Sequence, residues 1–268
     1  SVSPFIFDNF FQPVFLALFF LLINLYSHKN NKLKSYHDVN RDSLGTIFFP
    51  ISFIILAILF WENKYFIISS FLILAISDPL ASIVGNYYKK AHFYKISKEI
   101  KSIEGSLIMF LSTSTILFFL SDYIFNGYNI IHLTITILLC SIFITISESI
   151  STKGSDNLSI PLTAFIFIEM FNYLNESQSI IQFSFTISII IFSLFYFYRK
   201  NHLSLSGFLS ASLMAALITG LGGSLHLIPI IIFFISSTTI SKLGNSTKHK
   251  SSINRSVSQV ISNGGIPL

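Results

Sequence analysis

Residues 76–105 contain the side chains with the greatest capacity for chemistry. Asp78 lies at the end of an apolar run, and small residues follow it at Ala81, Ser82 and Gly85. In a helix these positions share one face, so a carboxylate lies on a strip of small side chains that leaves room for a ligand. Five lysines and a short polar stretch come next: Lys89, Lys90, Lys95, Lys98, Lys101, Ser102, Glu104 and Gly105. Lysines bind phosphate as point charges, so the pattern indicates a phosphate-rich ligand. The alternative is a positively charged loop beside an acid at the membrane surface.

A second segment of acids and bases follows the apolar run at 130–148. Glu148 ends that run, and an acid in this position is costly unless it faces protein, water or a cation. A base, a flexible turn, a second acid and an amide follow: Lys153, Gly154, Asp156 and Asn157. If both segments lie on one side of the membrane, they can together bind Mg²⁺ and a nucleoside triphosphate. The alternative for this segment alone is a helix end with a polar turn.

Composition predicts that these segments are carried by membrane-spanning helices. The chain of 268 residues is 52% hydrophobic and only 11% charged, which predicts an all-α polytopic membrane protein. Its continuous apolar runs do not alternate as the strands of a membrane barrel do. About nine spans are expected, near residues 10–26, 46–61, 65–84, 104–121, 130–148, 159–173, 180–198, 207–222 and 227–242. The single Cys140 falls inside a span, so neither a disulfide framework nor a thiol metal site is expected.

The distribution of basic residues predicts the orientation of these spans. All 17 lysines and arginines except Lys64 fall in the odd-numbered loops or the C-terminal tail. By the positive-inside rule those loops and the C-terminus are cytoplasmic, and the N-terminus is outside. Both charged segments are then on the cytoplasmic side. The net charge of +5 follows from this topology and requires no nucleic-acid partner.

Two local features affect how the helices position these residues. Pro79 follows Asp78 directly, which predicts either a kink in the third span or a new helix capped by Asp78. After Arg199 and Lys200 the chain becomes rich in small residues, which permit close helix packing and mark a second module.

Three ordered motifs carry a resemblance to a known family. SDPLASIVGNYYKK, KSIEGSLIMFL and ESISTKGSDNLSIPL resemble the phytol kinase and dolichol kinase family of CTP-dependent polyprenol kinases, over roughly residues 40–200. The order of an acid, small residues and two lysines, followed by Lys-Ser-X-Glu-Gly, also resembles the pattern of phosphatidate cytidylyltransferases. Pro79 departs from the small residue or threonine usual in that family. The tail resembles the opening part of the membrane domain that includes phytyl-phosphate kinase, so residues 1–204 and 205–268 are expected to form separate domains.

The resemblance implies an integral-membrane kinase that transfers the γ-phosphoryl group of CTP to a phytol-like isoprenoid alcohol at the cytoplasmic interface. Asp78, Glu148 and Asp156 are the expected catalytic and Mg²⁺-binding residues, with Glu148 either completing the metal site or accepting the alcohol proton. The expected nucleotide-binding residues are Ser82, Gly85, Lys89, Lys90, Lys101, Ser102, Glu104, Gly105, Lys153 and Asn157. The expected partners are membrane lipid, the alcohol and CTP. Two alternatives stay open: a cytidylyltransferase that makes a CDP-lipid, and a transporter whose buried acids line an ion pathway.

Overall fold

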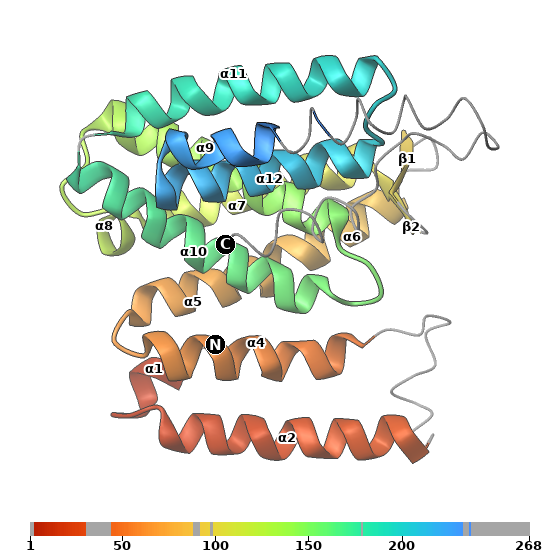
Figure 1. Cartoon of the computed structure of the whole chain (residues 1–268). Coiled ribbons are helices and arrows are strands. Elements are labelled where there is room, and N and C mark those ends of the chain that lie inside the picture. The colour runs from red at the N-terminus through yellow and green to blue at the C-terminus, as the bar shows by residue number, and fades with distance from the viewer. Residues whose placement is uncertain are drawn as a thin grey trace. The chain divides into compact units, whose positions relative to one another are not determined.

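The computed structural model describes residues 3–30, 44–87, 92–96, 99–177, 179–232 and 236. The chain is a mostly helical membrane protein, as predicted (Figure 1). In the described part, 6 helices are long and apolar enough to cross a membrane: Phe11–Lys29, Lys64–Tyr87, Ile130–Ile150, Asp156–Glu176, Ile180–Arg199 and Leu205–Gly222. The predicted spans at 46–61 and 104–121 coincide with two shorter apolar helices, Gly45–Phe60 and Ile103–Phe119. Most of the predicted ninth span lies outside the described residues, so the count of nine stays a prediction.

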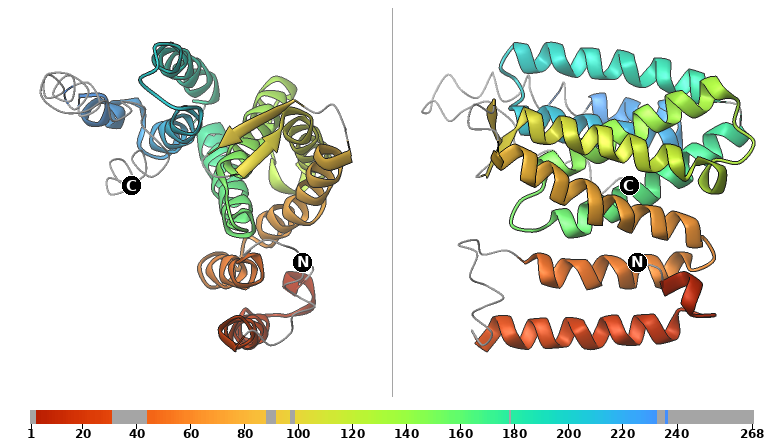
Figure 2. Two further views of the ribbon diagram at one scale, coloured as in Figure 1. Left: turned by 90° about the vertical axis from the view of Figure 1, so that its right-hand side faces the viewer. Right: turned by 180° about the vertical axis from the view of Figure 1, so that it is seen from behind.

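The chain divides into two compact units, Ser1–Glu169 and Met170–Leu268. The first unit contains the helices α1 (Ser3–Ile6), α2 (Phe11–Asn30), α4 (Gly45–Phe60), α5 (Lys64–Leu72), α6 (Asp78–Tyr87), α7 (Ile103–Phe119), α8 (Ser121–Ile124), α9 (Ile130–Ile150) and the start of α10 (Asp156–Glu176). It also contains the π-helix η1 (Ile73–Ser77) and the antiparallel strands β1 (Phe93–Ile96) and β2 (Glu99–Ser102). Figure 2 shows the β-hairpin lying across one end of these helices, with α8 at the other end in Figure 1.

The second unit contains the end of α10, α11 (Ile180–Arg199), α12 (Leu205–Gly222) and the 3₁₀ turn η2 (Ser224–His226). The small residues of α12 are used for close packing, as the sequence predicts. A Cβ at Gly220 would lie 2.0 Å from the Met170 sulfur, so the Met170 side chain packs into the space that the glycine leaves open. The division at 169/170 differs from the predicted domain boundary at 204/205, which stays a prediction.

The helix around Pro79 continues without a new cap. Asp78 has right-handed helical backbone angles, φ −65° and ψ −49°, rather than the extended angles of an N-cap residue. The preceding five residues, Ile73–Ser77, are wound as a π-helix. Proline has no N–H to bond the carbonyl four residues earlier, and the wider π turn lies at the position where that bond is missing. Of the two predicted geometries, the structure has an irregular continuous helix.

A second helical proline explains a contact between α4 and α10. Pro161 cannot donate to the carbonyl of Asn157, which would otherwise stay unbonded. The Ser52 Oγ lies 3.0 Å from that carbonyl oxygen and 2.8 Å from the carbonyl oxygen of Phe49. The hydroxyl of α4 therefore satisfies an acceptor in the first turn of α10, and it holds that turn in place.

Aromatic packing forms the interior of the first unit, and large apolar side chains cover its outside. Phe143 and Phe167 are both fully buried, with stacked rings whose centroids are 4.8 Å apart. Cys140 is buried beside them in α9, as expected of an apolar core residue. Phe11, Phe15 and many others on α2 are exposed, which suits contact with lipid.

Candidate functional site

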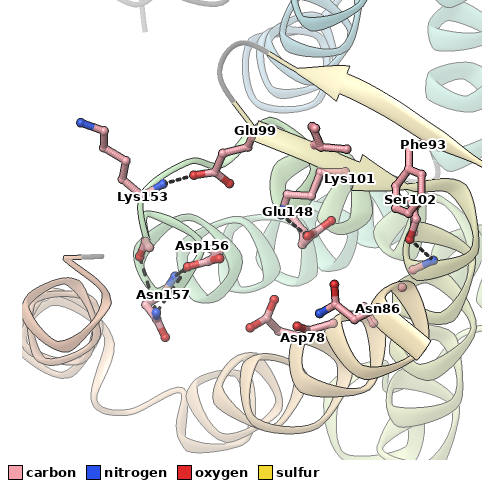
Figure 3. A pocket seen from close by; sticks show the side chains of 17 residues that line it. Asp78, Asn86, Phe93, Glu99, Lys101, Ser102, Glu148, Lys153, Asp156 and Asn157 are labelled. Carbon is pink, nitrogen blue, oxygen red and sulfur yellow. Dashed lines mark hydrogen bonds and ion pairs between the residues drawn. The ribbon is translucent and has the colours of Figure 1, made fainter. Parts of the chain in front are cut away.

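A cavity of about 690 Å³ lies at the hairpin end of the first unit (Figure 3). Three segments that are distant in sequence form it: α6, the hairpin with the first turn of α7, and the junction of α9 with α10. Its lining residues are Asp78, Ala81, Ser82, Gly85, Asn86, Phe93, Glu99, Ile100, Lys101, Ser102, Gly105, Ser106, Glu148, Lys153, Gly154, Asp156 and Asn157. The two charged segments that the sequence indicates therefore face one common space.

The α6 wall of the cavity has the composition that the sequence predicts. Asp78, Ala81, Ser82 and Gly85 all line the cavity, as residues on one helical face must. Asn86 lies beside them on the last turn of α6, and it presents an amide that sequence reasoning did not select. The wall is thus polar, and Ala81 and Gly85 keep its side chains short.

Residues 93–96 and 99–102 form two antiparallel strands, where the sequence predicted only a basic loop. Tyr94 pairs with Lys101, and Ile96 pairs with Glu99, so these four side chains lie on one face of the hairpin. The Tyr94 hydroxyl lies 2.6 Å from the Ser106 Oγ and 3.0 Å from the Ser149 Oγ, while Ile96 is buried. This inner face attaches the hairpin to α7 and α9.

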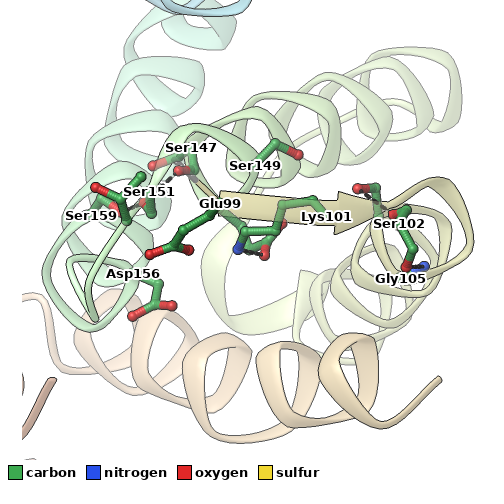
Figure 4. Close-up of polar contacts among 12 residues, drawn as sticks. Glu99, Lys101, Ser102, Gly105, Ser147, Ser149, Ser151, Asp156 and Ser159 are labelled. Atoms are coloured by element: carbon green, nitrogen blue, oxygen red, sulfur yellow. Dashed lines mark hydrogen bonds and ion pairs between the residues drawn. The ribbon is translucent and has the colours of Figure 1, made fainter. Parts of the chain in front are cut away.

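Lys101 and Glu148 form a buried ion pair in the cavity wall (Figure 3), and Figure 4 shows Lys101 on β2 between Glu99 and Ser102. Their side chains are only 18% and 8% exposed. Burial lowers the pKa of the Lys101 ammonium, but the charge and hydrogen bond of Glu148, with the charges of Asp156 and Asp78, raise it by more, so the net pKa is raised. The acid that ends the fifth predicted span thus has a cation partner in the protein itself.

Helices α6 and α7 approach closely behind the cavity. The Ser102 Oγ caps α7 by accepting a hydrogen bond from the Gly105 N–H at 3.1 Å. A Cβ added at Gly105 would lie 2.9 Å from the Ala81 carbonyl oxygen, and one at Gly85 would lie 2.6 Å from the Ser102 Oγ. Both glycines are therefore required by helix packing, in addition to lining the cavity.

The turn between α9 and α10 is held by its backbone. Lys153 has a φ of 54° and Gly154 a φ of 82°, a left-handed pair that turns the chain sharply. The Lys153 N–H donates to the Glu99 carboxylate at 2.5 Å, and its carbonyl accepts from the Leu44 N–H at 2.9 Å. The Lys153 side chain extends away from Asp156 in Figure 3.

The three acids of the predicted Mg²⁺ site, Asp78, Glu148 and Asp156, all line the cavity. The negative charges of Asp156 and Glu148 both act on Asp78, so the three acids lie near one another. Among the described residues, however, no group of three His, Cys, Asp or Glu side chains is arranged to hold one metal ion. Glu148 is paired with Lys101, whereas Asp78 and Asp156 form no ion pair with a lysine in the part of the chain that the structure describes. Mg²⁺ usually takes one or two carboxylates together with substrate phosphates, and this pair fits that requirement.

Every predicted site residue within the described part lines the cavity except Glu104. Its carboxylate instead accepts hydrogen bonds from the His92 backbone N–H at 3.0 Å and contacts the His92 Nδ1 at 2.9 Å, so it holds the start of β1 to α7. Lys89 and Lys90 lie outside the described residues. Sequence reasoning missed Asn86, Phe93, Glu99, Ile100 and Ser106, and the four-residue strands that carry three of them are too short to give a clear alternation signal.

The helices define a multi-pass integral membrane protein, and the comparison with family models agrees. Residues 188–268 match the family described as integral membrane protein DUF92. The match begins within α11 and does not reach the cavity residues. No match to the chain was found among the curated proteins or the solved structures compared with it.

Proposed function

We propose that the chain is a CTP-dependent kinase that phosphorylates a long-chain isoprenoid alcohol at the cytoplasmic surface of a membrane. The observation that carries the proposal is the cavity, which brings acidic and basic side chains together at one end of apolar helices. A membrane-dissolved alcohol and a water-soluble nucleotide can meet only at such an interface. The resemblance of the three motifs to polyprenol kinases supports the nucleotide and the alcohol as the substrates.

The cationic groups of the cavity suit a triphosphate. Lys101 and Lys153 bring positive charge, and the N-terminal turns of α7 and α10 both line the cavity. The N-terminus of a helix carries partial positive charge and favours anions. In this proposal Lys101 turns from Glu148 toward the phosphates when CTP binds.

Asp78 and Asp156 would hold Mg²⁺ on the phosphate oxygens. The ion would neutralise charge that develops on the transferring phosphoryl group. Phosphoryl transfer needs mainly positioning and charge stabilisation, so no covalent nucleophile is required of the protein. The two aspartates lie on different helices, α6 and α10. The turn at 151–155 directly precedes Asp156, so the distance between the two carboxylates depends on that turn.

In this proposal Glu148 receives the proton of the alcohol. When Lys101 moves to the phosphates, the Glu148 carboxylate loses its partner and becomes a base within the cavity. The alcohol oxygen then bonds to the γ-phosphorus, the bond from that phosphorus to the β-phosphate oxygen breaks, and CDP leaves. The proton of the alcohol passes to a carboxylate oxygen of Glu148.

Labelled CTP tests the proposal against its alternatives. Purified protein is incubated with phytol and with CTP carrying label at either the α or the γ phosphorus. The expected product is an alcohol phosphate that carries the γ label. Transfer of the α label to a lipid phosphate, with release of pyrophosphate, would identify a cytidylyltransferase. Solute flux into proteoliposomes without nucleotide binding would identify a transporter.

A matched pair of variants ties the activity to the cavity. Asp78→Asn removes a carboxylate from the cavity, whereas Asp122→Asn removes an exposed one from α8 at the far end of the unit. We expect the first variant to lose at least about a hundredfold in kcat, as expected when a metal-binding group is lost, and the second to retain normal activity. Equal activity of the two variants would disprove the assignment of Asp78.

A further inference from the structure

The β-hairpin has an outer face that the protein leaves uncovered. The register places Lys95 opposite Ile100 on this face, and Phe93 lies two residues before Lys95. The Phe93 and Ile100 side chains are 62% and 67% exposed, and Lys95 is exposed between them. The inner face carries the attachments to α7, α9 and the turn at Lys153 described above, and on the outer face Ser102, opposite Phe93, is buried as the cap of α7. The exposed part of the outer face, at Phe93, Lys95 and Ile100, is therefore apolar and basic.

Phe93 and Ile100 also line the cavity. They are the only large apolar side chains among the described residues that do so, since the other cavity residues are small, polar or charged. Because both side chains line the polar cavity and are also exposed, they form an apolar border between the cavity and the exterior. The hydrocarbon part of a ligand can extend outward across this border while its polar end stays in the cavity.

A row of exposed apolar side chains on α7 begins directly after the hairpin in the sequence. Ile103, Leu107 and Leu111 are all exposed, and their spacing of four residues places them in one row along the helix. This row begins directly after β2 and runs along an apolar helix, where lipid is the expected neighbour. The Lys95 ammonium beside Ile100 suits the lipid head-group level, because a lysine stem can lie on apolar surface while its charge stays in the polar layer.

We propose that the outer face of the hairpin is the portal through which the hydrocarbon tail of the lipid substrate passes from the cavity into the bilayer. The first carbons of the tail lie against Phe93 and Ile100, and the following ones lie along the row of Ile103, Leu107 and Leu111. This inference rests on the proposed function, and it adds where the alcohol enters and what part of it is recognised. The protein selects the hydroxyl end and the first carbons, and it leaves the far end of the chain in lipid.

Kinetics with a long and a short alcohol test the portal. Ile100→Ser removes apolar surface from the portal, and Phe119→Ser removes an exposed aromatic ring at the opposite end of α7. For Ile100→Ser we expect the KM for phytol to rise roughly tenfold, as expected for the loss of one apolar side-chain contact. We expect kcat, the KM for CTP and the KM for a five-carbon prenol to change less than about twofold, because these need little of the portal. Phe119→Ser should leave all four constants unchanged.

Other outcomes overturn the portal in distinguishable ways. An unchanged KM for phytol in Ile100→Ser, or an equal rise for both alcohols, overturns the portal and leaves the kinase proposal standing. No transfer of the γ label by the wild-type protein overturns both. A photoreactive phytol analogue provides a second test that needs no variant. The reactive group on its tail should label peptides within 93–111 of the wild-type chain, in competition with phytol, and labelling only elsewhere would refute the portal.

Discussion

The ion pair of Lys101 and Glu148 predicts a strong and asymmetric response to mutation. Removing one member of a buried ion pair leaves the other charge without compensation, at a cost of about 3–5 kcal/mol. Glu148 is the more buried member, at 8% exposed against 18% for Lys101. Lys101→Met, which strands the glutamate, should therefore lower the free energy of unfolding by about 3–5 kcal/mol, and Glu148→Gln should lower it by less. The double variant should be more stable than Lys101→Met alone, because no buried charge is left.

Equilibrium unfolding in mixed detergent micelles can measure these free energies. Trp61 is the single tryptophan and is buried in the first unit, so its fluorescence reports on that unit. Lys95→Met is the matched control, because Lys95 is an exposed lysine on the other face of the same hairpin. Its effect should stay within about 0.5 kcal/mol, as for ordinary surface changes. If the effects of Lys101→Met and Glu148→Gln add in the double variant to within about 0.5 kcal/mol, the two side chains are not coupled and the reasoning fails.

Three further predictions concern packing, pH and topology. Gly105→Ala should destabilise the protein by about 1–3 kcal/mol in the same assay, because its Cβ would lie 2.9 Å from a backbone oxygen of α6; a neutral result would show that α6 and α7 can separate freely. Because folding raises the pKa of Lys101, the stability that Lys101 contributes is fully present below the pKa of the unfolded state and is lost only as pH rises through the pKa of the folded state. An alkaline titration should therefore destabilise Lys101→Met less than the wild-type protein. Cysteine introduced at Lys95 should react with an impermeant maleimide only from the cytoplasmic side, and cysteine at Asp122 only from the opposite side; the reverse pattern would invert the predicted topology.

The sequence was sufficient to predict the long apolar helices, the shared face of α6 and several of the charged and polar residues that line the cavity. Apolar runs determine membrane helices, and a spacing of three and four residues determines which side chains share a face, so both can be read from a single chain. The nearness of Asp78 to Glu148 and Asp156 was predictable in coarse form, because the positive-inside rule places their loops on one side.

The hairpin could not be predicted in the same way. Its strands have four residues each, and a two-stranded hairpin is marginal in water without further packing. Its stability comes from tertiary contacts, such as Tyr94 with Ser149 and Lys101 with Glu148, whose partners are about fifty residues away in sequence. The direction of Glu104 was missed for the same reason, since its partner His92 becomes adjacent only when the hairpin forms.

The bond between Ser52 and the carbonyl of Asn157 has a consequence for how the chain can change during evolution. Pro161 leaves that carbonyl without a helical donor, and the serine hydroxyl supplies one. If another residue replaced the proline, α10 could bond the carbonyl itself, and the serine would no longer be needed there. If the serine were lost first, a partly buried acceptor next to Asp156 would lose its donor. Selection is therefore expected to retain the serine at position 52 wherever position 161 is proline, whereas related chains without the proline can lose the serine.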